Sequence, residues 1–398
     1  MESQESTTAS FRVAKDDLAE AVSWVARSLP TKGTQPVLTA VLLTADDQGL
    51  EIAGFDYETS NRMRISAEIN ENGSLAVSGR LLKNITSVLP NKPVDVQVES
   101  GSLVIACGAS RFEIPLIPTD DYPQLPKLPE LTGRIDPALF SSAVTQVAAA
   151  AGRDDALPML TGVCMEIKGK EVTLAATDRF RLALRKFEWE CSDESTTARL
   201  LIPAKTLLEN AKSLDSSIND PVDVHIGAGE EVGKDGLFGV HTEDRETTTR
   251  MLDAEFPNIN PLLPKSHTSM AIINIASLQE ALRRVSLLAE NGAQIRMEFS
   301  EGQVILAASS SKEGHAEETL PCVYSGNEDL LIAFNPGYLK DGLGVIRGDN
   351  VVFGFNEPSR PAILIPEPEQ MPEQNNEGVF DSPQTDFTYL LMPVRLPG

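Results

Sequence analysis

The chain has 398 residues, of which 41% are hydrophobic and 23% charged, a composition typical of globular proteins. At this length we expect two or three domains, and no apolar run approaches the ~20 residues needed to cross a bilayer. Asp and Glu outnumber Lys and Arg by 58 to 34, and the net charge of −24 argues against binding of nucleic acid over the whole surface, because the phosphates would repel it.

The chain begins with a polar and acidic segment, residues 1–10, that lacks the basic and apolar regions of a secretory signal. We therefore expect a cytoplasmic protein that does not enter a membrane. The cysteines support this expectation, because none of them has Cys-x-x-Cys spacing, and such scattered thiols are typical of reduced side chains rather than of disulfides or a zinc site. They are Cys107, Cys164, Cys191 and Cys322.

Three long helices are predicted at intervals of roughly 130 residues, which is an ordinary domain size. In each window the apolar residues recur at spacings of three and four, as along the buried face of a helix. The windows are 15–29, 136–151 and 276–290. The sequence is therefore a triple repeat.

The starts of these helices carry polar residues that favour capping. Asp17 with Glu20, and Ser277 with Glu280, have the spacing of a capping box, in which two side chains bond to the free N–H groups of the first turn. We expect the first and third of the long helices to begin at these residues.

Each long helix is followed by β-branched strand segments and then by an apolar strand that runs directly into a shorter helix. The shorter helices are predicted at 79–89, 203–214 and 336–346. Proline-rich segments at 115–130 and 257–266 separate the repeats. We therefore predict three domains, 1–130, 131–266 and 267–398, and an acidic surface loop between two strands at 366–387.

The six predicted helices differ in charge from the rest of the chain. They hold nine Lys and Arg against eight Asp and Glu, so nearly the whole negative charge lies in strands and loops. Helices that share one surface would form a comparatively basic face on an acidic body, which could accept DNA. Mixed charge on solvated helices explains the same count equally well.

Three repeats in an open arc leave sheet edges unpaired at both ends, which favours head-to-tail closure with a second copy. Two chains would supply twelve helices. At an interaxial distance of about 9.5 Å these would enclose a hole about 26 Å wide, enough for a nucleic-acid duplex.

Four motifs accompany the triple repeat: PVLTAVLL at 36–43, ATDRFRLA at 176–183, FPNINPLLP at 256–264 and MPVRL at 392–396. With these motifs the chain resembles, over nearly its whole length, the bacterial DNA polymerase III beta subunits, the sliding clamps. The resemblance implies an α+β fold of three tandem DNA-clamp domains, each with two helices packed on antiparallel sheets. It also implies a head-to-tail homodimer that forms a six-domain ring.

The same resemblance implies a processivity factor rather than an enzyme. Such a ring encircles double-stranded DNA without reading its sequence and needs no cofactor or metal. It tethers the replicative polymerase, the clamp loader and other proteins with a clamp-binding motif through a peptide groove. The resemblance places this groove at Leu160, Thr177, Arg179, Arg181, Leu182, Pro257, Leu262, Leu390, Met392, Pro393, Val394 and Arg395.

Two groove positions depart from the family pattern. Where many relatives have a small residue and a histidine after Ala-Thr-Asp, this chain has Arg179 and Phe180. We expect Arg179 to distinguish this groove from those of its relatives. The alternative reading of the segment is a half-buried strand with solvated arginines, and Arg185 and Lys186 are expected to be solvated in either case.

The resemblance also implies residues for DNA and for the dimer. Cations of the channel are expected at Lys32, Arg80, Lys83, Arg153, Lys205, Arg283 and Arg284. At the subunit interface, apolar contacts are expected from Phe112, Ile114, Leu287 and Leu288, and an ion pair from Arg111 to Glu317 or Glu318.

Two alternatives belong to other functional classes. A monomeric acidic scaffold could bind peptides through the same groove and never encircle DNA. An enzyme is disfavoured because the sequence contains no G-x-S-x-G or H-E-x-x-H motif. The four histidines, at 225, 241, 267 and 315, lie far apart without metal-ligand spacing, so the sequence predicts no metal site.

Overall fold

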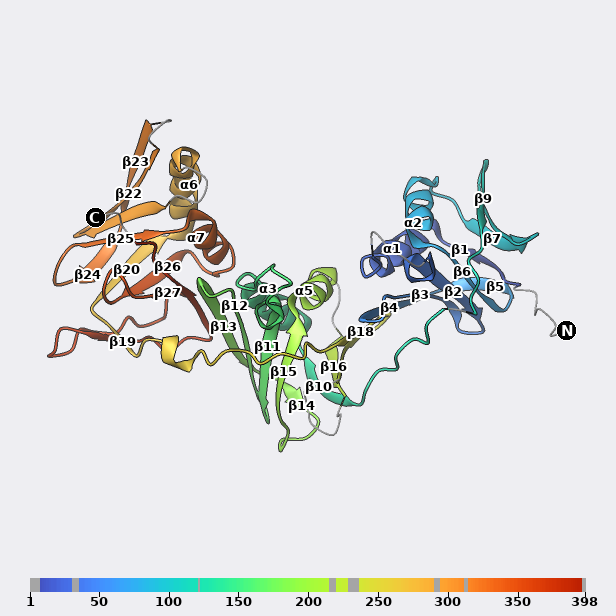
Figure 1. The fold of residues 1–398 in the computed structure, drawn as a ribbon, viewed down its shortest axis with the longest axis horizontal. Coiled ribbons are helices and arrows are strands. Elements are labelled where there is room, and N and C mark those ends of the chain that lie inside the picture. Colours follow the sequence, from blue (N-terminus) through green and yellow to red (C-terminus); the bar gives the residue numbers. More distant parts are fainter. Residues whose placement is uncertain are drawn as a thin grey trace. The chain divides into compact units, whose positions relative to one another are not determined.

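The computed structural model describes most of the chain, which folds into two compact units (Figure 1). Unit 1 comprises residues 1–136 and 219–251, and unit 2 comprises residues 137–218 and 252–398. The described residues are 8–30, 36–120, 122–214, 220–227, 236–289, 294–310 and 314–395. Among the helices in these ranges, none is long and apolar enough to span a membrane.

Unit 1 contains two antiparallel sheets and a pair of helices that pack on each other and on the larger sheet. The helices are α1 (Lys15–Val25) and α2 (Gly79–Val88), with a 3-10 turn η1 (Pro36–Thr39). The smaller sheet has the order β5 (Ala67–Glu71), β1 (Ser10–Val13), β7 (Val94–Glu99), β8 (Ser102–Cys107) and β9 (Ser110–Pro115). The larger sheet runs through β10 (Leu131–Ile135), β16 (Val222–Ile226), β17 (Leu237–Thr242), β18 (Arg245–Arg250), β4 (Thr59–Ile65), β3 (Gly49–Phe55), β2 (Ala40–Asp46) and β6 (Gly73–Ser78).

Unit 2 contains two helix pairs, α3 with α5 and α6 with α7, and two main sheets. The helical elements are α3 (Pro137–Ala148), α4 (Pro158–Thr161), α5 (Ala204–Ser213), η2 (Asn260–Leu262), α6 (Ile275–Val285), η3 (Ser286–Leu288) and α7 (Pro336–Leu343). The larger sheet has the order β15 (Thr197–Pro203), β11 (Gly162–Lys168), β12 (Glu171–Thr177), β13 (Arg181–Glu188), β29 (Phe387–Leu391), β27 (Ala362–Pro366), β26 (Asn350–Phe355), β20 (Ser269–Asn274) and β24 (Val323–Gly326). The smaller sheet has the order β23 (Gly314–Pro321), β22 (Gln303–Ser310), β21 (Ile295–Ser300) and β25 (Leu330–Phe334), and three further short strands are β14 (Glu190–Cys191), β19 (Ser266–His267) and β28 (Phe380–Asp381).

Each unit joins strands from two of the predicted repeats in one continuous sheet. In unit 1, β18 of the second repeat pairs with β4 of the first. In unit 2, β13 of the second repeat pairs with β29 at the end of the third, with Leu182 opposite Leu390. The two units thus divide the second repeat, and the exact boundaries of the three predicted domains stay a prediction.

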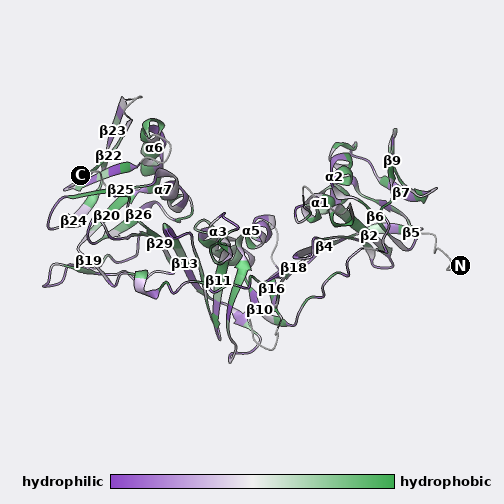
Figure 2. Cartoon of the chain, viewed as in Figure 1, coloured by the Kyte–Doolittle hydropathy of each residue, from purple (hydrophilic) through white to green (hydrophobic). Residues whose placement is uncertain are grey.

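The six predicted helices are all present, and their apolar spacing explains how they pack. In α6, the apolar residues Leu278, Leu282 and Val285, which follow this spacing, are each at most 2% exposed. Strands such as β11 carry hydrophobic residues on the helix-covered sheets, which appear green in Figure 2. Burial of these side chains is the main stabilising term of the fold.

The predicted capping boxes are each wrong by three positions. Helix α1 starts at Lys15 after the N-cap Ala14, so Asp17 lies inside its first turn. Helix α6 starts at Ile275, and its N-cap is Asn274, whose side-chain oxygen accepts a hydrogen bond from the Ser277 N–H at 3.0 Å. Both helices begin where a strand ends, and the strand register therefore decides which residue takes the cap.

The acidic segment 366–387 lies between β27 and β29, as predicted. It also contains the short strand β28, which pairs with β19 and places Phe380 opposite His267. Phe380 is 6% exposed and packs with Met270, Val352 and Ile365. Phe380, together with the partly buried Met371, thus anchors this acidic segment to unit 2.

Candidate functional site

The site begins at the tight turn between β12 and β13. The Asp178 carboxylate accepts hydrogen bonds from the N–H groups of Phe180 at 3.0 Å and Arg181 at 3.1 Å. The Thr177 hydroxyl donates to the Arg181 carbonyl at 2.6 Å and accepts from the Arg179 N–H at 3.2 Å. These bonds hold Arg179 at a φ of 79°, a left-handed conformation that few side chains adopt. The side chains of Arg179 and Phe180 consequently stand exposed at the tip.

The first repeat has the same turn between β3 and β4. There the Asp56 carboxylate accepts from the N–H groups of Glu58 and Thr59, and Tyr57 has a φ of 74°. The first and second repeats therefore share this Asp-led turn. What distinguishes the second repeat is the set of side chains that the turn presents.

Arg181, the first residue of β13, is the most strongly bonded cation of the site. It is 6% exposed, and its guanidinium lies 3.0 Å from the Asp178 carboxylate and 2.6 Å from that of Asp341. The guanidinium carbon also stacks 4.5 Å above the ring centroid of Tyr338. Burial alone would lower the pKa of Arg181, but its partners Tyr389, Asp341 and Asp178 outweigh burial and raise it. Arg181 therefore stays charged and ties β13 to α7.

A cavity of about 600 Å³ opens beside this turn. One wall comes from the second repeat and includes Leu160, Arg179 and Arg181, which the sequence assigned to the peptide groove. The other wall comes from α7, with Asn335, Tyr338 and Asp341. The ring of Phe180 stacks on that of Tyr338, with 6.0 Å between centroids. The arrangement suits an apolar or aromatic side chain flanked by charges of both signs.

The other predicted groove residues lie in three places. Thr177 and Leu182 are buried in β12 and β13, and Leu390 is buried beside them in β29. The segment after β29 runs along the turn, because the Met392 N–H donates to the Phe180 carbonyl at 2.8 Å. Pro393 is half-buried in this segment, whereas Val394 and Arg395 are exposed. Pro257 and Leu262 are exposed as well, and neither lines the cavity.

Sequence reasoning missed the contribution of α7. The helix itself was predicted at 336–346, and the Asn335 side chain that caps it accepts from the N–H groups of Gly337 and Tyr338. No local pattern could indicate, however, that Asp341 meets Arg181, 160 positions away.

The expectation that Arg185 is solvated is wrong. Its side chain is 14% exposed, and its guanidinium lies 2.5 Å from the Asp386 carboxylate. The pairing of β13 with β29 brings these residues together, because Arg185 stands opposite Phe387 in that ladder. Two arginines of this strand therefore join the second repeat to the third.

The predicted DNA-contacting cations are exposed wherever the structure describes them. Arg80 and Lys83 lie on α2, Lys205 lies on α5, and Arg153 lines the cavity described above. No ion pair involves these four side chains within the part of the chain that the structure describes. Lys32 lies outside the described residues.

The two arginines of α6 are different, because both have acidic partners. Arg283 lies 3.0 Å from Glu280, and Arg284 lies 3.2 Å from Glu280 and 2.6 Å from Glu318. Their charge is thus partly neutralised within the chain, which weakens their attraction for DNA.

The predicted interface residues lie on or beside two sheet edges. Phe112 is half-buried on the edge strand β9, and Leu287 is 76% exposed in η3, which contacts the edge strand β23. Leu288 beside it is half-buried. Ile114 is only 4% exposed and packs into the core of unit 1. It has little surface left for an interface, and Phe112, two positions earlier and therefore on the same face of β9, packs partly against the same core.

The charged residues predicted for the interface have partners within the chain. Arg111 lies 2.7 Å from Glu99, and Glu317 lies 3.5 Å from His315. Because Glu318 is bonded to Arg284, an ion pair with Arg111 of another copy would require an exchange of partners.

Three family models match successive parts of the chain. They describe the N-terminal, central and C-terminal domains of the DNA polymerase III beta subunit and match residues 9–126, 134–258 and 260–376.

Relatives and solved structures agree with these matches. The chain is 43% identical over 391 residues to the beta sliding clamp of Streptomyces coelicolor, covering 98% of this chain and 100% of the relative. The crystal structure of the sliding clamp of Bacillus subtilis is similar with a TM-score of 0.86 at 25% identity, covering 98% of this chain and 100% of that one. The crystal structure of a Pseudomonas aeruginosa sliding clamp bound to griselimycin is similar with a TM-score of 0.84 at 26% identity, covering 98% of this chain and 100% of that one.

Proposed function

We propose that this chain, which belongs to the family of DNA polymerase III beta subunits, closes head to tail with a second copy into a six-domain ring around duplex DNA. As a sliding clamp it is a processivity factor for DNA replication. The ring stays on DNA because it encloses the duplex, so it needs no catalytic residue of its own. It acts in the cytoplasm. Membership of this family does not favour the alternative of a monomeric peptide-binding scaffold.

The main observation in favour of the ring is a pair of unpaired sheet edges, one in each unit. Strand β9 is the outer strand of its sheet in unit 1, and β23 is the outer strand of its sheet in unit 2. Unpaired strand edges are templates for pairing with another chain. If β9 of one copy pairs with β23 of the next, the contact is head to tail, and two such contacts close a ring of two chains. Phe112 and the exposed Leu287 would then form the apolar part of each contact.

The exposed cations on the helices support contact with DNA. Arg80, Lys83 and Lys205 are free to approach phosphates without breaking an ion pair of the described chain. Phosphate contacts position a protein without reading bases, so a few of them over a layer of water permit sliding. Arg283 and Arg284 would contribute less, because Glu280 and Glu318 hold them.

The test of the ring uses a closed and an open DNA substrate. The purified protein is loaded on nicked circular plasmid, and the fraction retained at moderate salt is measured before and after the plasmid is linearised. A topological clamp is retained on the circle and slides off the linear form. Equal retention of the protein on circular and linear DNA would show ordinary electrostatic binding and would contradict the proposed ring.

The cavity between the β12–β13 turn and α7 supports a second part of the proposal, the docking of partner peptides. The replicative polymerase, the clamp loader and other proteins with clamp-binding motifs would insert an apolar side chain beside Phe180 and Tyr338. Arg179, exposed on the same turn, would select acidic residues in the peptide.

Replacing Phe180 with Ala is expected to weaken the binding of a polymerase-derived peptide about tenfold, or about 1.4 kcal/mol, because an aromatic anchor is lost. Fluorescence anisotropy of the labelled peptide measures the change. The matched control is Tyr57→Ala, since Tyr57 is 48% exposed against 53% for Phe180 and occupies the same turn in the first repeat. A tenfold loss in the control, or none in Phe180→Ala, would contradict the assignment.

A further inference from the structure

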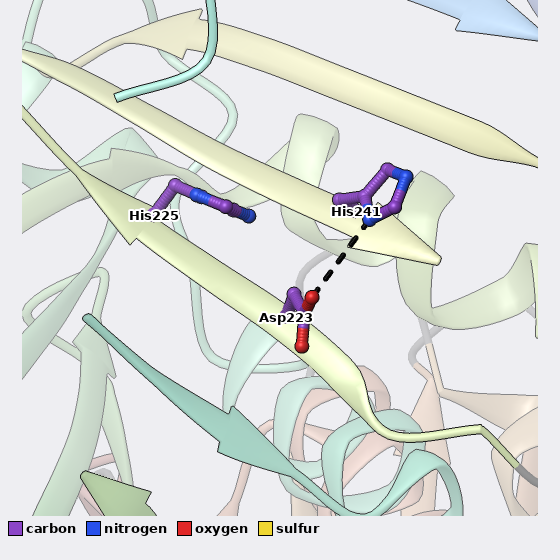
Figure 3. A group of neighbouring side chains, drawn as sticks. All are labelled: Asp223, His225 and His241. Atoms are coloured by element: carbon purple, nitrogen blue, oxygen red, sulfur yellow. Dashed lines mark ion pairs between the residues drawn. The ribbon is translucent and has the colours of Figure 1, made fainter. Parts of the chain in front are cut away.

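Three side chains that can bind a metal ion meet on one face of the larger sheet of unit 1. Asp223 and His225 are two positions apart on β16, so they point to the same side of the sheet. His241 of β17 stands directly opposite Asp223 in the antiparallel ladder, so it shares that side. Figure 3 shows the three side chains around one space above the two strands. The sequence predicted no metal site because the two histidines lie 16 positions apart, and the strand register brings them together.

The spacing of the three groups is close to that of a metal centre. One ligand atom from each lies within 4.8 Å of the others. His241 Nδ1 and Asp223 Oδ2 are 3.9 Å apart, which is too long for a hydrogen bond. Ligand atoms about 2.1 Å from a tetrahedral zinc ion are about 3.4 Å from one another. Side-chain rotations that shorten these distances by about 0.5 to 1.4 Å would complete the geometry.

A hydrogen bond to the backbone fixes the orientation of the His225 ring. Its Nδ1 lies 3.0 Å from the carbonyl oxygen of Pro129. A carbonyl can only accept, so Nδ1 carries the hydrogen, and in the neutral ring Nε2 therefore holds the lone pair. Nε2 is buried and has no hydrogen-bond partner among the described residues. A buried acceptor of this kind costs free energy unless something binds to it. Histidines that bind metals commonly donate their other N–H to a carbonyl in this way.

Asp223 is oriented in a similar way. Arg134 of β10 donates from Nε to Asp223 Oδ1 at 2.9 Å, which leaves Oδ2 on the side of His241. The positive charge of Arg134 disfavours a cation in the space. Glu246 of β18, directly opposite His241, adds a negative charge, and Arg62 lies 3.6 Å from its carboxylate.

We propose that Asp223, His225 and His241 form a binding site for one divalent transition-metal ion of the zinc class. Two imidazoles and one carboxylate suit zinc, copper, nickel or cobalt, whereas magnesium and calcium require mainly oxygen ligands. The ion would join β16 to β17 and, through His225, hold the segment at Pro129 against the sheet. A ligand that binds only the folded state stabilises that state, so a bound metal ion would stabilise the fold of unit 1.

The first experiment is titration of the full-length, metal-free protein with Zn²⁺ in a calorimeter. The wild type is expected to bind one ion per chain at this site. His225→Gln and His241→Gln are each expected to weaken that binding at least tenfold, because even changes behind a metal ligand cost about 10- to 100-fold in affinity. The matched control is His315→Gln, since His315 is an exposed histidine with an acidic neighbour, Glu317, outside the proposed site. His267 would be a poor control, because it is fully buried and burial lowers its pKa to about 4.

Thermal melting and diffraction separate loss of the site from loss of the fold. Zn²⁺ is expected to raise the melting temperature of the wild type and of His315→Gln, but not of His241→Gln. Anomalous scattering from zinc-soaked crystals of the wild type, which requires no variant, is expected to give a peak between the three side chains. The proposal is overturned if the peak lies elsewhere or is absent, if the wild type binds no ion, or if His225→Gln and His241→Gln bind as tightly as the wild type.

Discussion

Replacing Leu287 with Asp is expected to turn the dimeric protein into monomers and to abolish its retention on circular DNA. Leu287 is 76% exposed, the highest value among the large hydrophobic side chains that the structure describes as exposed. In the proposed ring it is buried against the Phe112 region of the next copy, where a carboxylate would be desolvated without a partner. An interface anchor of this kind contributes about 2–4 kcal/mol, so the dissociation constant should rise at least about 30-fold.

Sedimentation velocity measures the change in assembly, and the circular-plasmid assay measures its consequence. Tyr57→Asp is the control, because Tyr57 is 48% exposed on the turn between β3 and β4, outside both proposed contact strands. The control should remain dimeric and retained. A Leu287→Asp variant that is folded, dimeric and retained on the circle would show that the contact lies elsewhere.

Replacing Arg181 with Ala is expected to lower the free energy of unfolding of unit 2 by about 3 kcal/mol. The change leaves Asp178, whose side chain is 14% exposed, without its cationic partner. Removal of one partner from a buried ion pair costs about 3–5 kcal/mol. We expect the lower end of this range of energies, because the second partner of Arg181, Asp341, is 45% exposed and can be hydrated. Since Arg181 forms part of the cavity wall, peptide binding should weaken as well.

Tryptophan fluorescence during denaturation with urea can follow this unit separately. The chain has two tryptophans, Trp24 in unit 1 and Trp189 in unit 2, so a Trp24→Phe background reports on unit 2 alone. Arg185→Ala is the control, because Arg185 is a neighbouring arginine of β13 whose partner Asp386 is 56% exposed. The Arg185→Ala variant should lose about 1 kcal/mol of unfolding free energy, because an ion pair with an exposed partner contributes little. Equal losses in both variants would contradict the special role of Arg181.

Much of the fold and part of the candidate site follow from local features of the sequence. Apolar residues at spacings of three and four marked the three long helices, because one face of each helix must be buried wherever it lies. The three shorter helices were predicted from their matching position after an apolar strand in each repeat. The turn that presents Arg179 and Phe180 is also local, since it depends on the bonds that Asp178 and Thr177 make within four residues. The triple repeat and the four motifs identified the family.

The pairing of distant residues was decided by the tertiary structure alone. Strand register sets which residue caps α6, brings Arg185 to Asp386, and places His241 opposite Asp223. Helix packing brings Asp341 of α7 to Arg181. Local periodicity carries no information on such contacts, because they depend on which strands become neighbours and how far each is shifted. The sequence by itself thus determined the elements, their repetition and the family, whereas the partners of its buried charges and histidines were set when those elements packed.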